Sequence, residues 1–402
     1  MIIVAHRVRW IFVLVLKILA LLILAVVILS AAAVGYSAFR REQPVTLPAP
    51  TGPFAVGRMT RDWIDTSRPD PLNPAAGTDR ELLVWIWYPT DSPTSASAAP
   101  YLPADWAQTI DADLGIGRFL RQDLATVQGH ALADPPLATQ RAHYPVVIFE
   151  PGYGDLPANY STILENLASH GYVVVGIGPT DLAPVVFPDG RVVLRSPAGT
   201  IPDNAPPAVM EPLTENLVNV LSSDARFVLD QLQTANVGTL GQLAGRLDLT
   251  HVAFVGHSLG GATAIEVCRT DARCTAAIDI DGTPIGMSTT SGISRPLFVL
   301  QHPMSNDDDN FQKMSAVVAD STGPRLQLVL QGAQHLNFSD DAVLFEPLLG
   351  PLGVLGSIDG ARGLAVTNAY LVAFLDQYLR GTPAPLLNGP SPSYPEVTFL
   401  SS

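Results

Sequence analysis

Cysteine is scarce in this sequence, because 402 residues contain only Cys268 and Cys274. Two cysteines are too few for a disulfide-built scaffold or a four-cysteine zinc site, so the fold must depend on a hydrophobic core. Charged residues are also few, at 15%, while 47% of residues are hydrophobic, and this composition excludes an intrinsically disordered chain. By contrast, 35 prolines and 32 glycines indicate many turns and loops between short elements.

Basic residues are the scarcer of the charged residues, with 23 Lys and Arg against 37 Asp and Glu and a formal net charge of −14. Residues 1–41 hold five of the cations and no acid, which leaves 18 cations, 37 acids and a net charge of −19 for residues 42–402. A body this acidic is a poor partner for nucleic acid.

Residues 18–34 form an unbroken run of apolar and small residues, preceded by an apolar stretch that contains one charge, Lys17. About 20 apolar residues span a bilayer, so the sequence predicts a membrane-spanning helix. A long signal peptide, cleaved near residues 30–33, is the alternative. Arg7 and Arg9 favour a cytoplasmic N-terminus, which puts the rest of the chain on the extracytoplasmic side under either interpretation.

Composition divides the chain into residues 1–42, a membrane anchor or signal segment, and residues 43–402, one large domain without internal repeats. The Pro-rich residues 43–53 are predicted to be a stiff linker that holds this domain away from the membrane. Residues 180–212 interrupt the later pattern, with a predicted hairpin near Asp189, and are interpreted as a lid or an inert surface loop.

Apolar strands alternate with helical stretches from residue 145 onward, as in a mostly parallel sheet that is covered on both faces. The sequence therefore predicts a doubly wound α/β fold of seven or more strands. The predicted strands are residues 82–88, 145–149, 172–178, 251–256, 275–280, 296–300 and 325–331, and the longest predicted helices are 214–235 and 363–380.

The most specific local pattern is Gly256-His257-Ser258-Leu259-Gly260, which follows a predicted strand and opens a predicted helix. In this context G-x-S-x-G is a nucleophile elbow, in which small residues permit a turn that exposes the serine hydroxyl. The sequence therefore predicts that Ser258 is a catalytic nucleophile.

A nucleophilic serine needs a histidine base, and in α/β-hydrolases the chain order is serine, acid, histidine. Of the eight histidines, only His302 and His335 follow Ser258. His335 lies in the loop after the last predicted parallel strand, where a base can reach the serine. It is the predicted base, and His302 is interpreted as a loop histidine.

The acid has three candidates. Asp281 ends a predicted strand and precedes Gly282, so its carboxylate can lean toward the base. Asp279 lies two residues earlier, deeper in the sheet. The triplet at residues 307–309 is more typical of a solvated surface, and no spacing supports a metal site. Asp281 is the preferred acid.

Two backbone N–H groups must hold the oxyanion that forms on the substrate. One is that of Leu259, directly after the nucleophile, and the second predicted donor is Tyr153, in the Gly-rich loop after an earlier strand. Cys268 and Cys274 bracket a short turn between the helix after Ser258 and the strand that carries Asp281. Outside the cytoplasm we expect a disulfide there, with two free buried thiols as the alternative.

Taken together, these residues resemble the plasma platelet-activating-factor acetylhydrolase family, lipoprotein-associated phospholipases of the α/β-hydrolase fold, and its bacterial relatives. The similarity runs through most of residues 52–340, and the pattern H-x-N-F-x-D that begins at His335 is its most specific part after the elbow. The resemblance implies that Ser258, Asp281 and His335 form the catalytic triad. One departure is Glu150-Pro-Gly, where relatives commonly have Ser-His-Gly.

The sequence thus predicts a serine ester hydrolase without metal or organic cofactor, and the resemblance implies that its substrates are short-acyl phospholipids or related lipid esters. A cutinase-like polyester hydrolase or general carboxylesterase is the first alternative. A membrane-tethered, non-catalytic binding protein with a hydrolase fold is the second, and the intact set of Ser258, Asp281 and His335 argues against it.

Overall fold

A ten-stranded sheet forms the centre of the protein in this computed structural model, which describes residues 2–91, 96–202, 205–236, 238, 240–286, 291–345 and 353–400. Side by side, its strands are β14 (Val397–Phe399), β13 (Arg325–Leu330), β12 (Leu297–Gln301), β11 (Cys274–Ile280), β10 (Leu247–His257), β6 (Tyr144–Glu150), β7 (Val173–Ile177), β3 (Asp79–Thr90), β2 (Ala55–Pro69) and β5 (Ala131–Ala133).

Six neighbouring strands, from β13 to β7, run parallel to one another. The strands that flank them, β14 and β3, run in the opposite direction, and β2 is antiparallel to β3. The predicted mostly parallel sheet is therefore confirmed. Its carboxyl edge gathers the ends of β10, β11 and β12, where ligands bind in open α/β folds.

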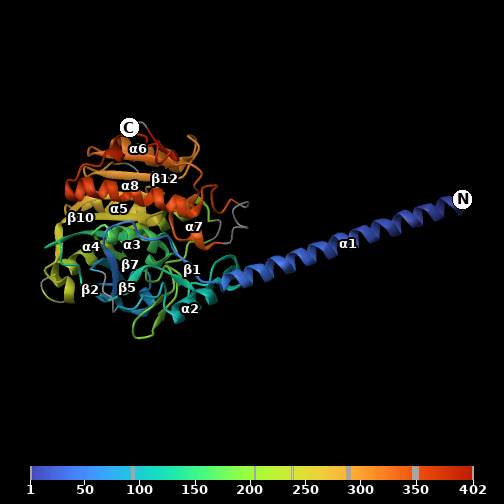
Figure 1. Ribbon diagram of the computed structural model, residues 1–402, viewed down its shortest axis with the longest axis horizontal. Helices are drawn as coiled ribbons and strands as arrows, with labels where there is room; N and C mark the ends of the chain where they lie inside the picture. The colour runs from blue at the N-terminus through green and yellow to red at the C-terminus, as the bar shows by residue number, and fades with distance from the viewer. Residues whose placement is uncertain are drawn as a thin grey trace.

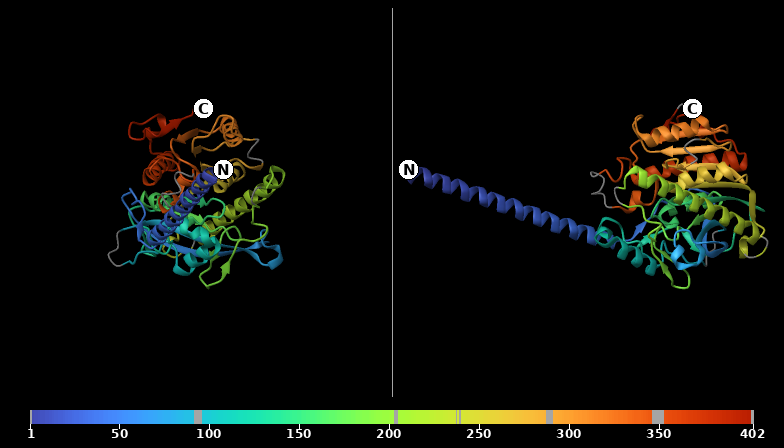
Figure 2. Two further views of the ribbon diagram at one scale, coloured as in Figure 1. Left: turned by 90° about the vertical axis from the view of Figure 1, so that its right-hand side faces the viewer. Right: turned by 180° about the vertical axis from the view of Figure 1, so that it is seen from behind.

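Helices cover both faces of the sheet. One face carries α3 (Ser161–Ser169) and α8 (Gly360–Arg380), and the other carries α4 (Pro207–Ala235), α5 (Leu259–Thr270) and α6 (Asp309–Asp320). In Figure 1, α8 lies in front of the sheet, whereas the view from behind in Figure 2 has α4 in front. The two long predicted helices correspond to α4 and α8.

Burial along β6 explains the apolar runs of the sequence. Val147 and Phe149 pack into the core cluster that contains α3 and α8, while Val146 and Ile148 pack into the cluster that contains α4, α5 and α6. Because successive side chains of a strand point to opposite faces, a strand covered on both sides needs an apolar residue at every position.

The N-terminal helix α1 (Ile2–Arg41) projects from the domain as one long, exposed helix (Figures 1 and 2). Its stretch Phe12–Arg41 has the length and composition of a membrane span, and a signal sequence has the same properties. At its C-terminal end Arg41 is buried and forms an ion pair with Asp111 of α2 (Ala104–Leu114). The helix thus runs directly into the domain.

Residues 43–53 differ from the predicted spacer, because they lie on the domain. Within them β1 (Val45–Thr46) pairs in parallel with β4 (Val127–Gln128), and Leu47 belongs to the hydrophobic core. The backbone N–H of Thr51 donates to the side chain of Asn166, 2.9 Å away. This segment therefore fastens the end of α1 to the domain instead of holding the two apart.

The predicted interruption at residues 180–212 contains the expected hairpin, formed by the antiparallel strands β8 (Val185–Val186) and β9 (Val192–Val193). The segment ends on the first turns of α4, and its residues 203 and 204 lie outside the described residues. Its root is packed onto the sheet, since the backbone carbonyl of Thr180 accepts a hydrogen bond from Arg80 of β3.

Candidate active site

Ser258 occupies a sharp turn between β10 and α5. Its backbone has φ 56° and ψ −119°, a region that L-residues rarely adopt and that marks stored strain. The turn depends on glycine on both sides, because a Cβ at Gly256 would lie 2.1 Å from the backbone of Gly260, and one at Gly260 would lie 2.0 Å from the carbonyl oxygen of Glu150. The predicted elbow geometry is therefore present.

Ser258, His335 and Asp281 form a hydrogen-bonded chain. The hydroxyl of Ser258 lies 3.0 Å from His335 Nε2, and His335 Nδ1 lies 2.6 Å from Asp281 Oδ2. The three residues come from the end of β10, the residue after β11, and the short helical turn His335–Phe338 after β13. The structure thus brings together the three residues that the sequence selects.

Asp281 is the carboxylate that reaches His335. Its side chain is 0% exposed, and its backbone has a positive φ of 55°, which lets the carboxylate leave the strand direction. Burial alone would raise the pKa of this carboxyl, but hydrogen bonds from His302 and His335 outweigh it and hold the pKa well below the usual range. Asp281 therefore stays ionised.

His302 is the residue of the site that the sequence interpretation missed. Its backbone N–H and its Nδ1 contact Asp281 Oδ1 at 2.8 and 2.7 Å, so it is bound to the acid and is not merely a loop histidine. The predicted parallel order of the strands could have indicated this contact. Parallel pairing of β11 and β12 brings the residues that follow these two strands, Asp281 and His302, to the same sheet edge.

Asp279 has different surroundings, although only one residue separates it from Asp281. Its Oδ1 accepts a hydrogen bond from the backbone N–H of Gly282 at 2.6 Å, and its carboxyl group lies against Gly261. Burial raises the pKa of Asp279 to about 8, so this carboxyl is protonated at neutral pH. A neutral, buried side chain cannot stabilise an imidazolium as a carboxylate does.

The aspartate triplet has a structural role at the start of α6. Asp308 is the N-cap of this helix, and its side chain accepts hydrogen bonds from the backbone N–H groups of Asn310 and Phe311. Asp309 is the first residue of the helix, where a negative charge favours the helix dipole.

Tyr153 and Leu259, the two predicted oxyanion donors, line the same cavity as Ser258. The hydroxyl of Tyr153 donates to the carbonyl of Gly199 at 3.1 Å and accepts from the N–H of Ile201 at 2.8 Å. The 180–212 segment therefore holds the loop that carries Tyr153. Leu259 begins α5, whose N-terminal end favours a developing negative charge.

The cavity over Ser258 has a volume of about 400 Å³. It shares part of its wall with a second cavity of about 620 Å³ that extends along the start of α4 and α6. The residues common to both walls are Thr214, Thr283, Ile285 and Asn310. An ester bound at Ser258 can therefore extend into the second cavity.

His257, inside the elbow, contacts the loop that carries His335. One of its ring nitrogens lies 3.1 Å from the backbone carbonyl of His335, and the other lies 2.8 Å from the hydroxyl of Tyr160. Burial, followed by repulsion from His335, lowers the pKa of His257 to about 3, so this imidazole is neutral. A neutral donor of this kind fixes the loop of the base without adding charge.

The only group of possible metal ligands within the described part of the chain is His257, Asp281 and His335, whose ligand atoms lie within 4.8 Å of one another. Most of these atoms already serve hydrogen bonds, notably the 2.6 Å contact between His335 and Asp281. A metal ion there would have to replace those bonds, so the arrangement suits proton transfer better than metal binding.

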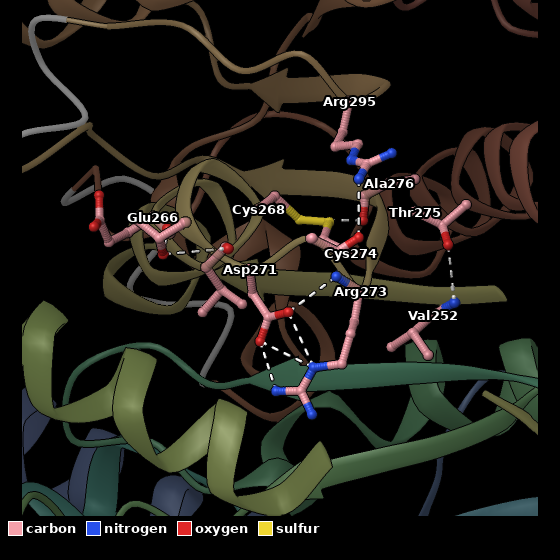
Figure 3. The surroundings of a disulfide bond; sticks show 12 residues. Val252, Glu266, Cys268, Asp271, Arg273, Cys274, Thr275, Ala276 and Arg295 are labelled. Carbon is pink, nitrogen blue, oxygen red and sulfur yellow. Dashed lines mark hydrogen bonds and ion pairs between the residues drawn. A yellow bond between two sulfur atoms is a disulfide. The ribbon is translucent and has the colours of Figure 1, made fainter. Parts of the chain in front are cut away.

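A disulfide joins Cys268 of α5 to Cys274, the first residue of β11, with 5.1 Å between the Cα atoms (Figure 3). The turn between the two cysteines is stabilised a second time, because Asp271 accepts hydrogen bonds from the backbone N–H and the guanidinium of Arg273. The bond therefore connects the helix that follows Ser258 to the strand that precedes Asp281.

Comparison with known proteins identifies relatives over most of the chain. The family model described as platelet-activating factor acetylhydrolase, isoform II, matches residues 39–183 and 224–382. The unmatched stretch between these segments contains most of the 180–212 interruption. An internal segment that the family model does not match therefore lies beside the candidate active site.

Individual relatives agree with this match. Platelet-activating factor acetylhydrolase of Cavia porcellus is 26% identical over 83% of this chain and 78% of its own. A probable 1-alkyl-2-acetylglycerophosphocholine esterase of Arthroderma benhamiae is 28% identical over 88% and 93%. The solved ferulic acid esterase of Streptomyces cinnamoneus has a TM-score of 0.76 and 33% identity, and covers 89% of this chain and 99% of its own. The chain therefore belongs to the platelet-activating factor acetylhydrolase isoform II family of ester hydrolases with an α/β-hydrolase fold.

Proposed function

We propose that this protein is a serine ester hydrolase in which Ser258 is the nucleophile, His335 the base and Asp281 the acid that orients the base. The observation that carries the proposal is the hydrogen-bonded chain from Asp281 through His335 to the Ser258 hydroxyl, at 2.6 and 3.0 Å. Those distances suit proton transfer from the serine to the imidazole.

The reaction has two matched halves. Ser258 Oγ attacks the ester carbonyl while its proton passes to His335, and the oxyanion is held by the N–H groups of Tyr153 and Leu259. As the intermediate collapses, His335 gives the proton to the departing alcohol and an acyl-serine remains. Water then attacks this acyl group with His335 as base, which releases the acid and restores Ser258.

We propose lipid esters with a short acyl chain as the substrate class. Two observations support it: the Cavia porcellus relative is named an acetylhydrolase, and the Arthroderma benhamiae relative is named an esterase of a 2-acetyl glycerophospholipid. A cavity of about 400 Å³ at Ser258 accommodates a small acyl group, and the adjoining cavity offers room for a larger alcohol.

A general carboxylesterase or polyester hydrolase is the second candidate. It is favoured by the 33% identity to a ferulic acid esterase over nearly the whole of that chain. A hydrolysis panel separates the candidates if it contains a 2-acetyl phospholipid, nitrophenyl esters of increasing acyl length, methyl ferulate and a polyester film. The first candidate predicts the highest kcat/KM on the 2-acetyl phospholipid, and a preference for ferulate or film would replace it with the second.

Labelling with a fluorophosphonate probe tests the nucleophile. We expect the full-length protein to be labelled, Ser258→Ala to lose both label and activity, and Ser305→Ala, a serine in an exposed loop beyond β12, to keep both. Hydrolysis that survives in Ser258→Ala would disprove the assigned nucleophile. Neither label nor hydrolysis in the unmodified protein would instead favour a non-catalytic binding protein.

We further propose that α1 stays in the cytoplasmic membrane, with the domain on the extracytoplasmic side. The basic flank of the apolar run and the presence of a disulfide in the domain support this location. N-terminal sequencing of the mature protein separates an anchor from a signal peptide, because cleavage would leave a chain that begins after the apolar run.

A further inference from the structure

His302 makes three hydrogen bonds to Asp281 that the proposed reaction does not use. Its backbone N–H lies 2.8 Å from Oδ1, and its Nδ1 lies 2.7 Å from Oδ1 and 2.8 Å from Oδ2. Its ring also lines the cavity above Ser258. A group bound this closely to the acid and adjacent to the substrate cavity must influence the base that the same acid serves.

Asp281 is shared between two imidazoles. His335 Nδ1 contacts Oδ2 at 2.6 Å, and the ring centroids of His302 and His335 lie 6.5 Å apart. Two donors of His302 meet Oδ1, and its Nδ1 also reaches Oδ2, so His302 holds the carboxylate in the orientation in which Oδ2 meets His335. Because the Asp281 side chain is 0% exposed, no solvent competes for this orientation.

One carboxylate can balance the charge of one imidazolium but not of two. The first proton that the three groups bind is stabilised by Asp281, whereas a second proton would put two cations about 6.5 Å apart. Where the first proton resides therefore decides whether His335 is free to accept the proton of Ser258.

His302 lies among two carboxylates and two imidazoles. It faces the carboxylates of Asp281, after β11, and Asp308, before α6, together with the imidazoles of His335 and of the neutral His257. Burial lowers the pKa of His302, but the hydrogen bond to Asp281 and the charges of both carboxylates outweigh it, so the net shift is upward.

We infer that His302 is a positioning residue, which fixes the Asp281 carboxylate through its backbone N–H and its Nδ1 and acts by charge on His335, the base that the same carboxylate serves. This inference depends on the proposed function, because it assumes that His335 and Ser258 carry the reaction. When His302 is protonated, its positive charge opposes protonation of His335 and extends activity toward lower pH.

Two substitutions separate the hydrogen bond from the charge. His302→Asn keeps a donor N–H near the position of Nδ1 but cannot be protonated, and His302→Phe removes both. In His302→Asn we expect the acidic limb of the kcat/KM profile to move up by about one pH unit, with a maximal kcat within about threefold of the original. His302→Phe should in addition lower the maximal kcat by about tenfold at similar KM.

A matched control exists at the opposite end of the sheet. His251 Nδ1 contacts Asp248 Oδ2 at 2.7 Å, the same chemistry outside the active site. The full-length protein in detergent, its His251→Asn variant and both His302 variants are compared on one short-acyl nitrophenyl ester between pH 5 and 9. His251→Asn should leave the profile unchanged.

Imidazole titration by NMR on the unsubstituted protein gives a second readout that requires no variant. We expect the pKa of His302 to lie above the usual value of a histidine, because the hydrogen bond to Asp281 and the charges of Asp281 and Asp308 raise it. An acidic limb that does not move in His302→Asn, or a pKa of His302 that is not raised, overturns the inference. Activity retained in Ser258→Ala and in His335→Asn would overturn the proposed function itself, which keeps the two failures distinguishable.

Discussion

Two completely buried carboxylates, Asp224 and Asp281, differ in the cations that surround them. Asp224 of α4 is held by Arg80, whose Nη2 lies 2.8 Å from Oδ2, and by the guanidinium of Arg68. Asp281 is held by two histidines at 2.6 and 2.7 Å. A guanidinium keeps its charge at every relevant pH, whereas an imidazole gains and loses its charge near neutrality.

The two clusters accordingly serve different ends. Arg80 also contacts Asp181 at 3.4 Å and the carbonyl of Thr180 at 3.0 Å, so it ties the root of the 180–212 segment and α4 to β3. This cluster therefore has a structural role. The Asp281 cluster instead opens on the substrate cavity and contains groups that can move a proton. In this protein, the buried carboxylate that is paired with permanently charged arginines has a structural role. The buried carboxylate that is paired with titratable histidines lies where proton transfer is proposed.

Replacement of Asp281 by asparagine should give the largest effect. The amide cannot stabilise the imidazolium of His335 and favours the wrong tautomer, so we expect kcat to fall by about 10⁴-fold. The fold should persist, because asparagine conserves the size of the side chain. Steady-state hydrolysis of a nitrophenyl ester, together with circular dichroism, measures both quantities.

Asp279→Asn is the matched control for that substitution. Because Asp279 is already neutral at pH 7, its amide analogue should retain kcat within about tenfold. A greater loss in Asp279→Asn than in Asp281→Asn would reverse the assignment of the acid and break the contrast between the two buried clusters.

Replacement of Arg80 by methionine should reveal the structural cluster. It leaves the buried carboxylate of Asp224 without its main cation, and loss of one partner of a buried ion pair typically costs about 3–5 kcal/mol. We expect chemical denaturation to show this loss, while the folded fraction keeps kcat within about tenfold. The control is Arg191→Met, which breaks ion pairs of a half-exposed guanidinium with Glu81 and Asp189 and should cost much less stability, because solvent screens exposed pairs.

Equal losses of unfolding free energy in the two arginine variants would show that Arg80 does not hold these segments together more strongly than an exposed ion pair does. A loss of kcat in Arg80→Met as great as in Asp281→Asn would show that the two clusters act together on the reaction. Either result would remove the division between structural and catalytic charge.

Local sequence patterns were sufficient for the elements that position the site. The glycines around Ser258 predicted the turn, and the alternation of apolar strands with helices predicted the parallel sheet. Chain order selected His335, and the place of Asp281 after a strand selected it over Asp279. The structure gives these residues the expected geometry, and their catalytic role stays a prediction.

Contacts between distant parts of the chain could not be predicted in this way. Arg80 meets Asp224 across 144 residues, and neither position has a local pattern that points to the other. Residues 43–53 were interpreted as a spacer because they are rich in proline. Their partner β4 has only two residues, too few to be recognised as a strand from the sequence. His302 was missed because its role depends on the pairing of β12 with β11.

The pH dependence of stability distinguishes the two neighbouring aspartates further. The pKa of Asp279 in the folded protein, about 8, lies above its unfolded value near 3.8. The folded state therefore holds this proton to higher pH than the unfolded state does. The stability that the bound proton contributes is complete below pH 3.8 and is lost as the pH rises through 8. Relative to the unsubstituted protein, Asp279→Asn should gain about 1 kcal/mol of stability per pH unit between pH 5 and 7. Parallel stability curves would show that Asp279 is ionised in the fold, like Asp281.

Loss of the disulfide should change activity least, and it tests whether the Asp281 cluster needs a covalent brace. Cys268 and Cys274 close a loop with a sequence separation of six, for which loss of the bond costs about 2 kcal/mol. The strands β10 and β11 remain paired from Val252 to His257 without it, so Ser258 and Asp281 should keep their relative positions. We therefore expect the double variant Cys268→Ser and Cys274→Ser to denature more easily but to retain kcat within about threefold. Mass spectrometry with and without reductant confirms the bond in the parent protein. A fall in kcat of a hundredfold or more, without loss of fold, would show that the Asp281 cluster depends on the brace, whereas the Arg80 cluster is held by charge alone.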